Sequence, residues 1–252
     1  MLRRVPLAFV CAGLCVCGLA GPCRGAVVPL RVTGSMSGAA EVTDHASGVS
    51  DTESFDAALR VSESEMTSTT TQRTRTASVG GQTAQSWSQC DAGTTEGGGL
   101  RAGVMSFASQ GEGSLGTVGS QSCDRTARAT TTQTTEFKVT GRAQAYRFRG
   151  TLTGVSDPAA ADEAQQRLSR VRLVGEGGVV HEFDTAQAAA GSFDVSGTLE
   201  PGTYRVEVTT CARAASGRTR SADPMIASAQ WSLEPTTGLA KAKAGTVVAK
   251  RP

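Results

Sequence analysis

The chain has two histidines, the side chains best suited to acid–base chemistry at neutral pH. His181 shares one face of an alternating stretch with Val179 and Phe183, which predicts a half-buried strand position. His45 stands in a polar segment near Asp51, which predicts a loop. A serine nucleophile would need a motif such as G-x-S-x-G, which the sequence does not contain. These patterns predict no catalytic centre.

Other sequence motifs of catalytic or ligand-binding sites are absent or lack the structural context that they require. Residues 111–116 match G-x-G-x-x-G, but they lie in the glycine-rich stretch 93–119 and precede no helix of a nucleotide-binding unit. Walker, H-E-x-x-H and EF-hand patterns do not occur. Carboxylates that could pair across strands are Glu176, Glu182, Asp184 and Glu200. Glycoside hydrolysis needs separations of ~5–10 Å that spacing cannot establish. We expect a protein that has no enzymatic activity, binds no cofactor and has no metal site.

Aromatic side chains would carry sugar binding, because their flat faces stack on sugar rings. Trp231 and Tyr204 fall on the apolar faces of alternating stretches, which predicts core packing. Trp87 has polar neighbours on both sides within residues 85–90. It is therefore the candidate for an exposed ligand-binding platform.

Cysteine usage suggests one disulfide in an exported protein. We expect Cys90 to pair with Cys123, closing the base of the glycine-rich stretch. The chain-entropy model gives such a bridge roughly 3–4 kcal/mol of stabilisation. Cys211 is expected to be free or paired with Cys23. No C-x-x-C follows residue 20, which argues against zinc and thioredoxin-type chemistry.

The first twenty residues are typical of a secretory signal peptide. Arg3 and Arg4 precede an apolar run over residues 7–20, and small residues then allow cleavage between positions 20 and 26. The run is too short to span a bilayer core of ~30 Å. We therefore expect a secreted or cell-surface protein. The rarity of Lys among its 25 basic residues indicates a GC-rich bacterial genome.

The expected mature chain carries no net charge. The sequence has 25 basic and 23 acidic groups, so removal of Arg3 and Arg4 leaves 23 of each. A neutral surface gives no electrostatic attraction to nucleic acid or anionic lipid. No later stretch approaches the length of a transmembrane helix, so we expect no membrane span. The partners expected are an extracellular or cell-surface protein, or a polysaccharide.

The remaining sequence is typical of β-strands in two parts of different texture. Residues 27–140 are rich in Ser, Thr and Gly, and Thr suits an extended, partly solvated sheet. Residues 141–235 alternate clearly, as in Tyr146, Phe148 and Leu152 with polar residues between them. Several such strands at short spacing predict an antiparallel β-sandwich of jelly-roll or Ig-like type. We expect one sandwich over residues 27–235, because the first part is too thinly apolar for a second core.

Turns and other elements follow from local chemistry. Residues 176–178 (Glu-Gly-Gly) predict a hairpin turn, and residues 199–202 (Leu-Glu-Pro-Gly) a type II turn. Residues 156–170 predict one short helix, capped by Asp157 and Pro158. The glycine-rich residues 93–119 predict a loop, and residues 236–252 a disordered tail.

Residues 197–208 read Gly-Thr-Leu-Glu-Pro-Gly-Thr-Tyr-Arg-Val-Glu-Val. This segment resembles the G-x-L-x-P-G-x-Y turn of uncharacterised exported bacterial β-sandwich proteins. The resemblance covers about residues 144–235. It implies a sandwich fold with a final strand at residues 227–233, and it implies no particular activity, because such modules serve adhesion, carbohydrate binding and plain structure alike.

Two functional hypotheses follow. The first is an exported structural or interaction protein of the cell surface or extracellular space, without catalysis. The alternative is a carbohydrate-binding β-sandwich module. The alternative requires an exposed Trp or Tyr on a sheet face or loop, and Trp87 is the residue expected to supply it.

Overall fold

Twelve antiparallel strands and no helix make up the described part of the chain. A computed structural model describes residues 25–62, 68–112, 123–154, 166–185, 191–216 and 225–236. The strands are β1 (Ala26–Asp44), β2 (Val49–Ser62), β3 (Ser68–Val79), β4 (Gln82–Thr94), β5 (Leu100–Glu112), β6 (Cys123–Thr140), β7 (Gln144–Thr153), β8 (Gln166–Gly175), β9 (Gly178–Asp184), β10 (Gly191–Leu199), β11 (Gly202–Ser216) and β12 (Met225–Pro235). None of the described residues forms a helix able to cross a membrane.

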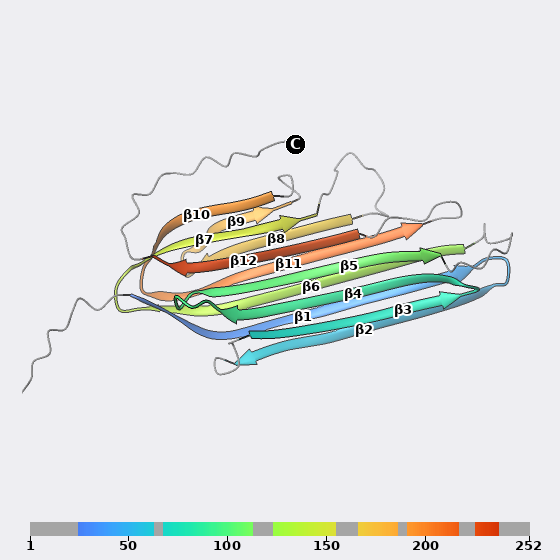
Figure 1. Ribbon diagram of the computed structural model, residues 1–252, viewed down its shortest axis with the longest axis horizontal. Coiled ribbons are helices and arrows are strands. Elements are labelled where there is room, and N and C mark those ends of the chain that lie inside the picture. Colours follow the sequence, from blue (N-terminus) through green and yellow to red (C-terminus); the bar gives the residue numbers. More distant parts are fainter. Residues whose placement is uncertain are drawn as a thin grey trace, which may run out of the picture.

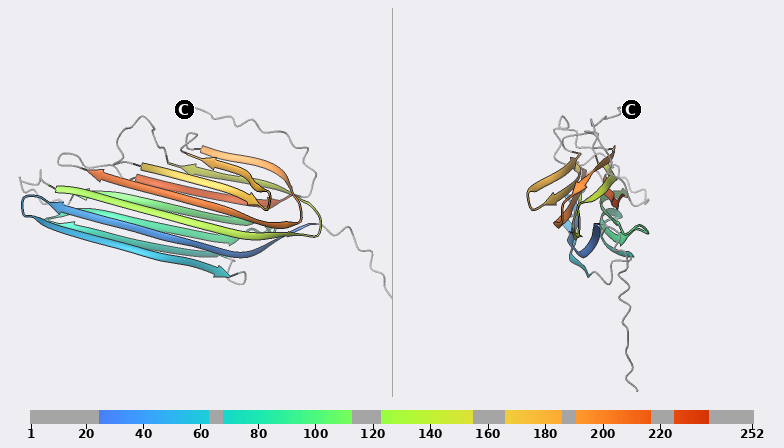
Figure 2. Two further views of the ribbon diagram at one scale, coloured as in Figure 1. Left: turned by 180° about the vertical axis from the view of Figure 1, so that it is seen from behind. Right: turned by 90° about the vertical axis from the view of Figure 1, so that its left-hand side faces the viewer.

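The strands form two six-stranded sheets packed face to face (Figures 1 and 2). Sheet A has the order β2-β1-β6-β11-β8-β9, and sheet B has the order β10-β7-β12-β5-β4-β3. The predicted all-β antiparallel sandwich is confirmed. Long strands run side by side along the long axis of the molecule, and the end-on view shows the two layers (Figure 2).

Both parts of the sequence contribute to each sheet. In sheet A, β6 of the first part pairs with β11 of the second. In sheet B, β5 of the first part pairs with β12 of the second. Strands from both parts therefore contribute large apolar side chains to one core.

Alternation along the strands explains how so polar a sequence builds a sheet interior. In β6, every second residue is buried over all 18 positions. Thr131, Gln133 and Thr135 point inward and are buried, whereas Thr130 and Thr132 are partly exposed on the other face. A β-branched hydroxyl side chain fits either face of a pleated sheet, so one Thr-rich strand serves both sides.

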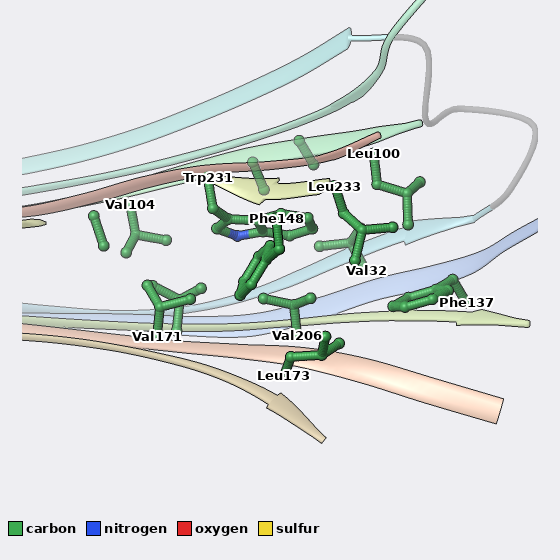
Figure 3. Close-up of a cluster of buried hydrophobic side chains, with 14 of the residues drawn as sticks. Val32, Leu100, Val104, Phe137, Phe148, Val171, Leu173, Val206, Trp231 and Leu233 are labelled. Atoms are coloured by element: carbon green, nitrogen blue, oxygen red, sulfur yellow. The ribbon is translucent and has the colours of Figure 1, made fainter. Parts of the chain in front are cut away.

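The core changes in character along the sandwich. At the end where β1 begins, it holds large side chains such as Phe137, Phe148 and Trp231. Figure 3 shows the ring of Phe148 between the two sheets, close to Trp231. At the end where β6 begins, a second cluster consists almost entirely of alanine, with Val42 and Met225 as its larger members.

Small side chains bring the two sheets close together near the alanine-rich end. The Ser86 hydroxyl of sheet B donates a hydrogen bond of 2.6 Å to the Arg128 carbonyl of sheet A. Farther along the core, the Ser106 hydroxyl lies 2.8 Å from the Thr210 hydroxyl, again across the sheets. Direct bonds from one sheet to the other's backbone replace the thicker apolar layer found at the opposite end.

Several aromatic rings lie over glycines of neighbouring strands. Phe193 faces its register partner Gly150, and Tyr146 faces its register partner Gly197. A Cβ placed on Gly150 would lie 2.6 Å from the Phe193 ring. Aromatic coverage of a strand glycine restores the packing that the missing side chain gives up. These glycines therefore leave the space that the aromatic rings fill.

The two lateral sides of the sandwich close differently. On the side of β2 and β3, Arg75 and Glu53 form an ion pair of 3.7 Å. Arg75 also donates to the Thr74 carbonyl on the edge strand β3, at 2.9 Å. Such charges on an edge strand oppose pairing with another chain. On the other side, Phe183 of β9 stacks on Phe193 of β10 with ring centroids 4.0 Å apart.

Two predicted elements are wrong in the described residues. Residues 166–170 of the predicted helix belong to strand β8, because Val171 and Leu173 continue an alternating buried face that begins at Ser169. Residues 100–112 of the predicted glycine-rich loop form strand β5, paired on both sides. Glycine there removes side chains without breaking the ladder. The rest of the predicted helix, the signal peptide and the tail after Thr236 lie outside the described residues.

The two predicted turns have different outcomes. The hairpin turn after Gly175 is confirmed, since β8 pairs with β9 and Gly178 has a φ of +109°. The turn at residues 199–202 joins β10 to β11, which lie in different sheets. The type II prediction is wrong, because Gly202 does not have the positive φ that this turn needs. The Pro-Gly pair instead carries the chain from one sheet to the other.

Candidate functional site

The outer face of sheet B carries the candidate residue Trp87. Along β4, burial alternates at every position from Gln82 to Ala92, so Gln85, Trp87 and Gln89 point outward. Trp87 is partly exposed. Of the polar neighbours that singled it out in the sequence, Gln85 and Gln89 share this outer face, whereas Ser86 and Ser88 are buried between the sheets.

The other large polar aromatics lie inside the sandwich or against it. Trp231 and Tyr146 are 3% and 2% exposed. Tyr204 is partly buried, stacks on Phe137 with ring centroids 5.7 Å apart, and donates its hydroxyl to the Glu200 carbonyl at 3.0 Å. The chain has two Trp and two Tyr, and all four are in the described residues. Of these, Trp87 is the one on an outer sheet face.

A row of residues in register crosses sheet B near Trp87. The row contains Thr70, Asp91, Gly103, Gln230, Thr151 and Ser192, one from each of β3, β4, β5, β12, β7 and β10. Two open depressions follow it, of about 450 and 460 Å³. Both are lined by Gln230 and Trp231, so they meet at β12. We call this row and its two depressions the cross-strand groove.

One end of the groove combines an amide, a carboxylate and a cation. The Gln89 amide donates to both carboxylate oxygens of Asp91, at 3.1 and 2.9 Å. Arg101 is exposed and lines the same depression. Within the described residues, no hydrogen bond or ion pair involves its guanidinium. This end therefore offers both donors and acceptors to a ligand.

The other end of the groove is held by ion pairs. Arg149 donates to the Ser232 hydroxyl at 3.2 Å and to Glu234 at 2.6 Å. Arg147 donates through its Nε to Asp194 at 2.8 Å. This hydrogen bond and the charge of Arg147 lower the pKa of the Asp194 carboxyl. Positive and negative side chains alternate here, which fixes their positions on the sheet surface.

The outer face of sheet A has a different texture. Ion pairs cross its strands, such as Arg31 with Glu136 at 2.8 Å and Arg172 with Glu207 at 3.4 Å. Beside them, Ser35 and Thr132 bond through their hydroxyls at 2.8 Å. The charges neutralise one another within the sheet surface, and exposed pairs of this kind contribute little to stability.

The structure does not bring the two histidines together. The His181 imidazole lies 2.8 Å from the Tyr146 hydroxyl and packs among aromatic rings, including Phe148. Burial lowers the pKa of His181 and raises the pKa of Tyr146 to about 12. The predicted half-buried strand position of His181 is confirmed by its partial burial in β9.

His45 lies at the opposite end of the molecule, in the turn between β1 and β2. Its Nε2 is 2.7 Å from Asp124, and both side chains are well exposed. The neighbouring Ser47 hydroxyl donates to Asp44 at 2.7 Å, so it is not aligned with the imidazole. No group of three or more His, Cys, Asp or Glu side chains suited to a metal occurs in the described ranges.

The predicted Cys90–Cys123 disulfide is wrong. Both thiols are free and buried. Cys123 begins β6 at the end where Arg125 bonds Gln82 at 2.7 Å, whereas Cys90 lies eight residues along β4 from Gln82, about 27 Å for an extended strand. A disulfide requires Cα atoms within about 7 Å. Cys211, partly buried on sheet A, is also free, and Cys23 lies outside the described residues.

A comparison with protein-family models and with curated proteins finds no match for this chain. Function is therefore inferred from the surface of the molecule. Sequence reasoning identified Trp87 but missed the cross-strand groove. The groove depends on register across six strands, and Gly103 and Arg101 lie in a segment whose glycine content suggested a loop.

Proposed function

We propose that this chain is an exported, non-catalytic interaction protein that binds polysaccharide through the outer face of sheet B. The observation that carries the proposal is Trp87, a partly exposed indole on a sheet face, with Gln85 and Gln89 beside it along β4. A flat apolar ring beside amides and hydroxyls suits a sugar, whose ring has apolar faces and polar edges.

The neighbours of Trp87 supply the polar part of such recognition. Gln85 and Gln89 flank it along β4, and Thr74 is its register partner on β3. Each amide can donate and accept hydrogen bonds, and the Thr hydroxyl can do both. Two paired strands hold the four positions, so little backbone ordering is required when a ligand binds.

Two further observations support binding without catalysis at the cell exterior. The N-terminal residues have the pattern of a secretory signal, and the expected mature chain carries no net charge. His45 and His181 lie far apart, one in an exposed turn and the other among buried rings. We accordingly assign neither a catalytic role.

The test is retention of the purified mature protein on a panel of insoluble polysaccharides and cell-wall preparations. We expect retention on at least one polymer and its loss in Trp87→Ala. A matched control is Val180→Ala, which removes an exposed apolar side chain from sheet A instead. Equal retention of Trp87→Ala and the unsubstituted protein would contradict the role of Trp87. Absence of retention on every polymer would favour a protein partner or a structural role.

A further inference from the structure

We propose that the cross-strand groove is a second contact region, which binds one uncharged polysaccharide chain lying across the strands of sheet B. This inference rests on the proposed function but concerns a different part of the same face. Trp87 lies four residues from Asp91 along β4, about 14 Å in an extended strand. The groove must therefore be tested separately from Trp87.

Continuity of the groove is the first argument. Its two depressions meet at Gln230 and Trp231, and together they reach from Ser192 on β10 to Thr70 on β3. Six strands at a spacing of about 4.8 Å give the row a length of about 24 Å. An extended chain of several sugar rings fits this shape better than a compact ligand does.

The position of Gly103 is the second argument. It is the one member of the row without a side chain, and it lies between Asp91 and Gln230. A Cβ placed on Gly103 would meet the Gln230 Cγ at 3.3 Å, with Asp91 Oδ2 at 3.9 Å. Gly103 is itself buried, so a larger side chain at this position would displace the Gln230 side chain into the middle of the groove.

The chemistry of the lining is the third argument. Gln230 offers its amide, and Gln89 offers the amide that also bonds Asp91. The hydroxyls of Thr70, Thr151 and Ser192 line β3, β7 and β10. These groups can both donate to and accept from sugar hydroxyls.

Charge decides between neutral and acidic chains. The groove is lined by Arg101 and Arg149 and by Asp91 and Asp194, two positive and two negative side chains. An acidic chain would be attracted by the two arginines and repelled by the two aspartates, so the lining gives it no net electrostatic gain. A neutral chain meets no such repulsion, and both charge types can bond its hydroxyls.

The experiment is affinity electrophoresis in native gels that contain one soluble polymer each. The neutral polymers are hydroxyethyl cellulose, xyloglucan, mixed-linkage glucan and galactomannan, and the acidic polymer is polygalacturonate. The variants are Gly103→Val, which fills the groove, Gln230→Ala, which removes its central amide, and Trp87→Ala, which tests the proposed function. Thr83→Val, on the outer face of β4 beyond the groove, is the matched control. Urea unfolding midpoints establish that each variant is folded.

We expect at least one neutral polymer to retard the protein and polygalacturonate not to retard it. Gly103→Val should weaken retardation at least tenfold, Gln230→Ala should weaken it, and Thr83→Val should match the unsubstituted protein. Normal retardation of a folded Gly103→Val together with loss in Trp87→Ala would overturn the groove while leaving the proposed function standing. Preferential binding to polygalacturonate would overturn the uncharged class. No retardation of the unsubstituted protein by any polymer would overturn both.

Discussion

Substituting Gly38 by Ala should destabilise the protein, although the same change usually stabilises a strand. Gly38 faces inward from β1, opposite Phe55 of β2. A Cβ there would lie 2.1 Å from Ser86 Oγ and 2.4 Å from the nearest Phe55 ring carbon. Ser86 is held by its bond to the Arg128 carbonyl of the opposite sheet. One methyl group therefore has no free space between the sheets.

The magnitude follows from two opposing effects. Ala in a strand is ordinarily more stable than Gly by roughly 0.5–1 kcal/mol, because Gly loses more backbone entropy on folding. Overpacking a tight core costs about 1–3 kcal/mol. The overpacking cost is the larger, so we expect a net loss of about 1–2 kcal/mol in the free energy of unfolding. With a urea m-value of about 2–3 kcal/mol/M, the midpoint should fall by roughly 0.5 M.

The assay is urea unfolding with a matched glycine as control. In Gly103→Ala, the nearest atom to the new Cβ is the Gln230 Cγ at 3.3 Å, on a flexible side chain. That variant should unfold at the same urea concentration as the unsubstituted protein, or a higher one. Adding Ser86→Gly to Gly38→Ala should recover part of the loss, because the two sites contact each other. A Gly38→Ala variant as stable as the unsubstituted protein would refute the close approach of the sheets.

Two further predictions concern titration and thiols. Burial lowers the folded-state pKa of His181, so the unfolded chain binds more protons than the folded protein does. The contribution of the neutral imidazole to stability is present above the ordinary His pKa of about 6.5 and is lost as pH falls further. Lowering the pH from 7.5 to 5 should therefore lower the urea midpoint more for the unsubstituted protein than for His181→Gln. Equal decreases in the two proteins would contradict this. Without reductant, iodoacetamide at pH 8 should label the partly buried Cys211 before Cys90, whose pKa burial raises to about 12. Labelling of Cys90 and Cys123 in urea without reductant should be complete, and resistance of both would indicate a bridge.

The sandwich was predictable because alternation of apolar and polar residues is a local property of the chain. Tyr146, Phe148 and Leu152 alternate with polar residues, and all three are buried on one face of β7. Strand β4 reverses this pattern, because Trp87 is partly exposed whereas the serines beside it, Ser86 and Ser88, are buried. Where side chains mark the two faces of a strand, the sequence alone indicates which ones point inward.

Other features depended on contacts between distant residues. Strand β5 lacks a clear alternation of apolar and polar residues, because Gly103 on one face and Ser106 on the other are both small. Its pairing with β4 and β12 makes this segment a strand. The disulfide prediction relied on the length of the intervening segment, whereas register places Cys90 and Cys123 far apart. The cross-strand groove joins six strands that are not consecutive, so no local window contains it.

The most direct test of the central claim is retention of Trp87→Ala on the polysaccharide that retains the unsubstituted mature protein. We predict that the variant unfolds at the same urea concentration and is no longer retained, because Trp87 lies on the outer face and not in the core. A folded Trp87→Ala that is retained as well as the unsubstituted protein would contradict polysaccharide binding through this face.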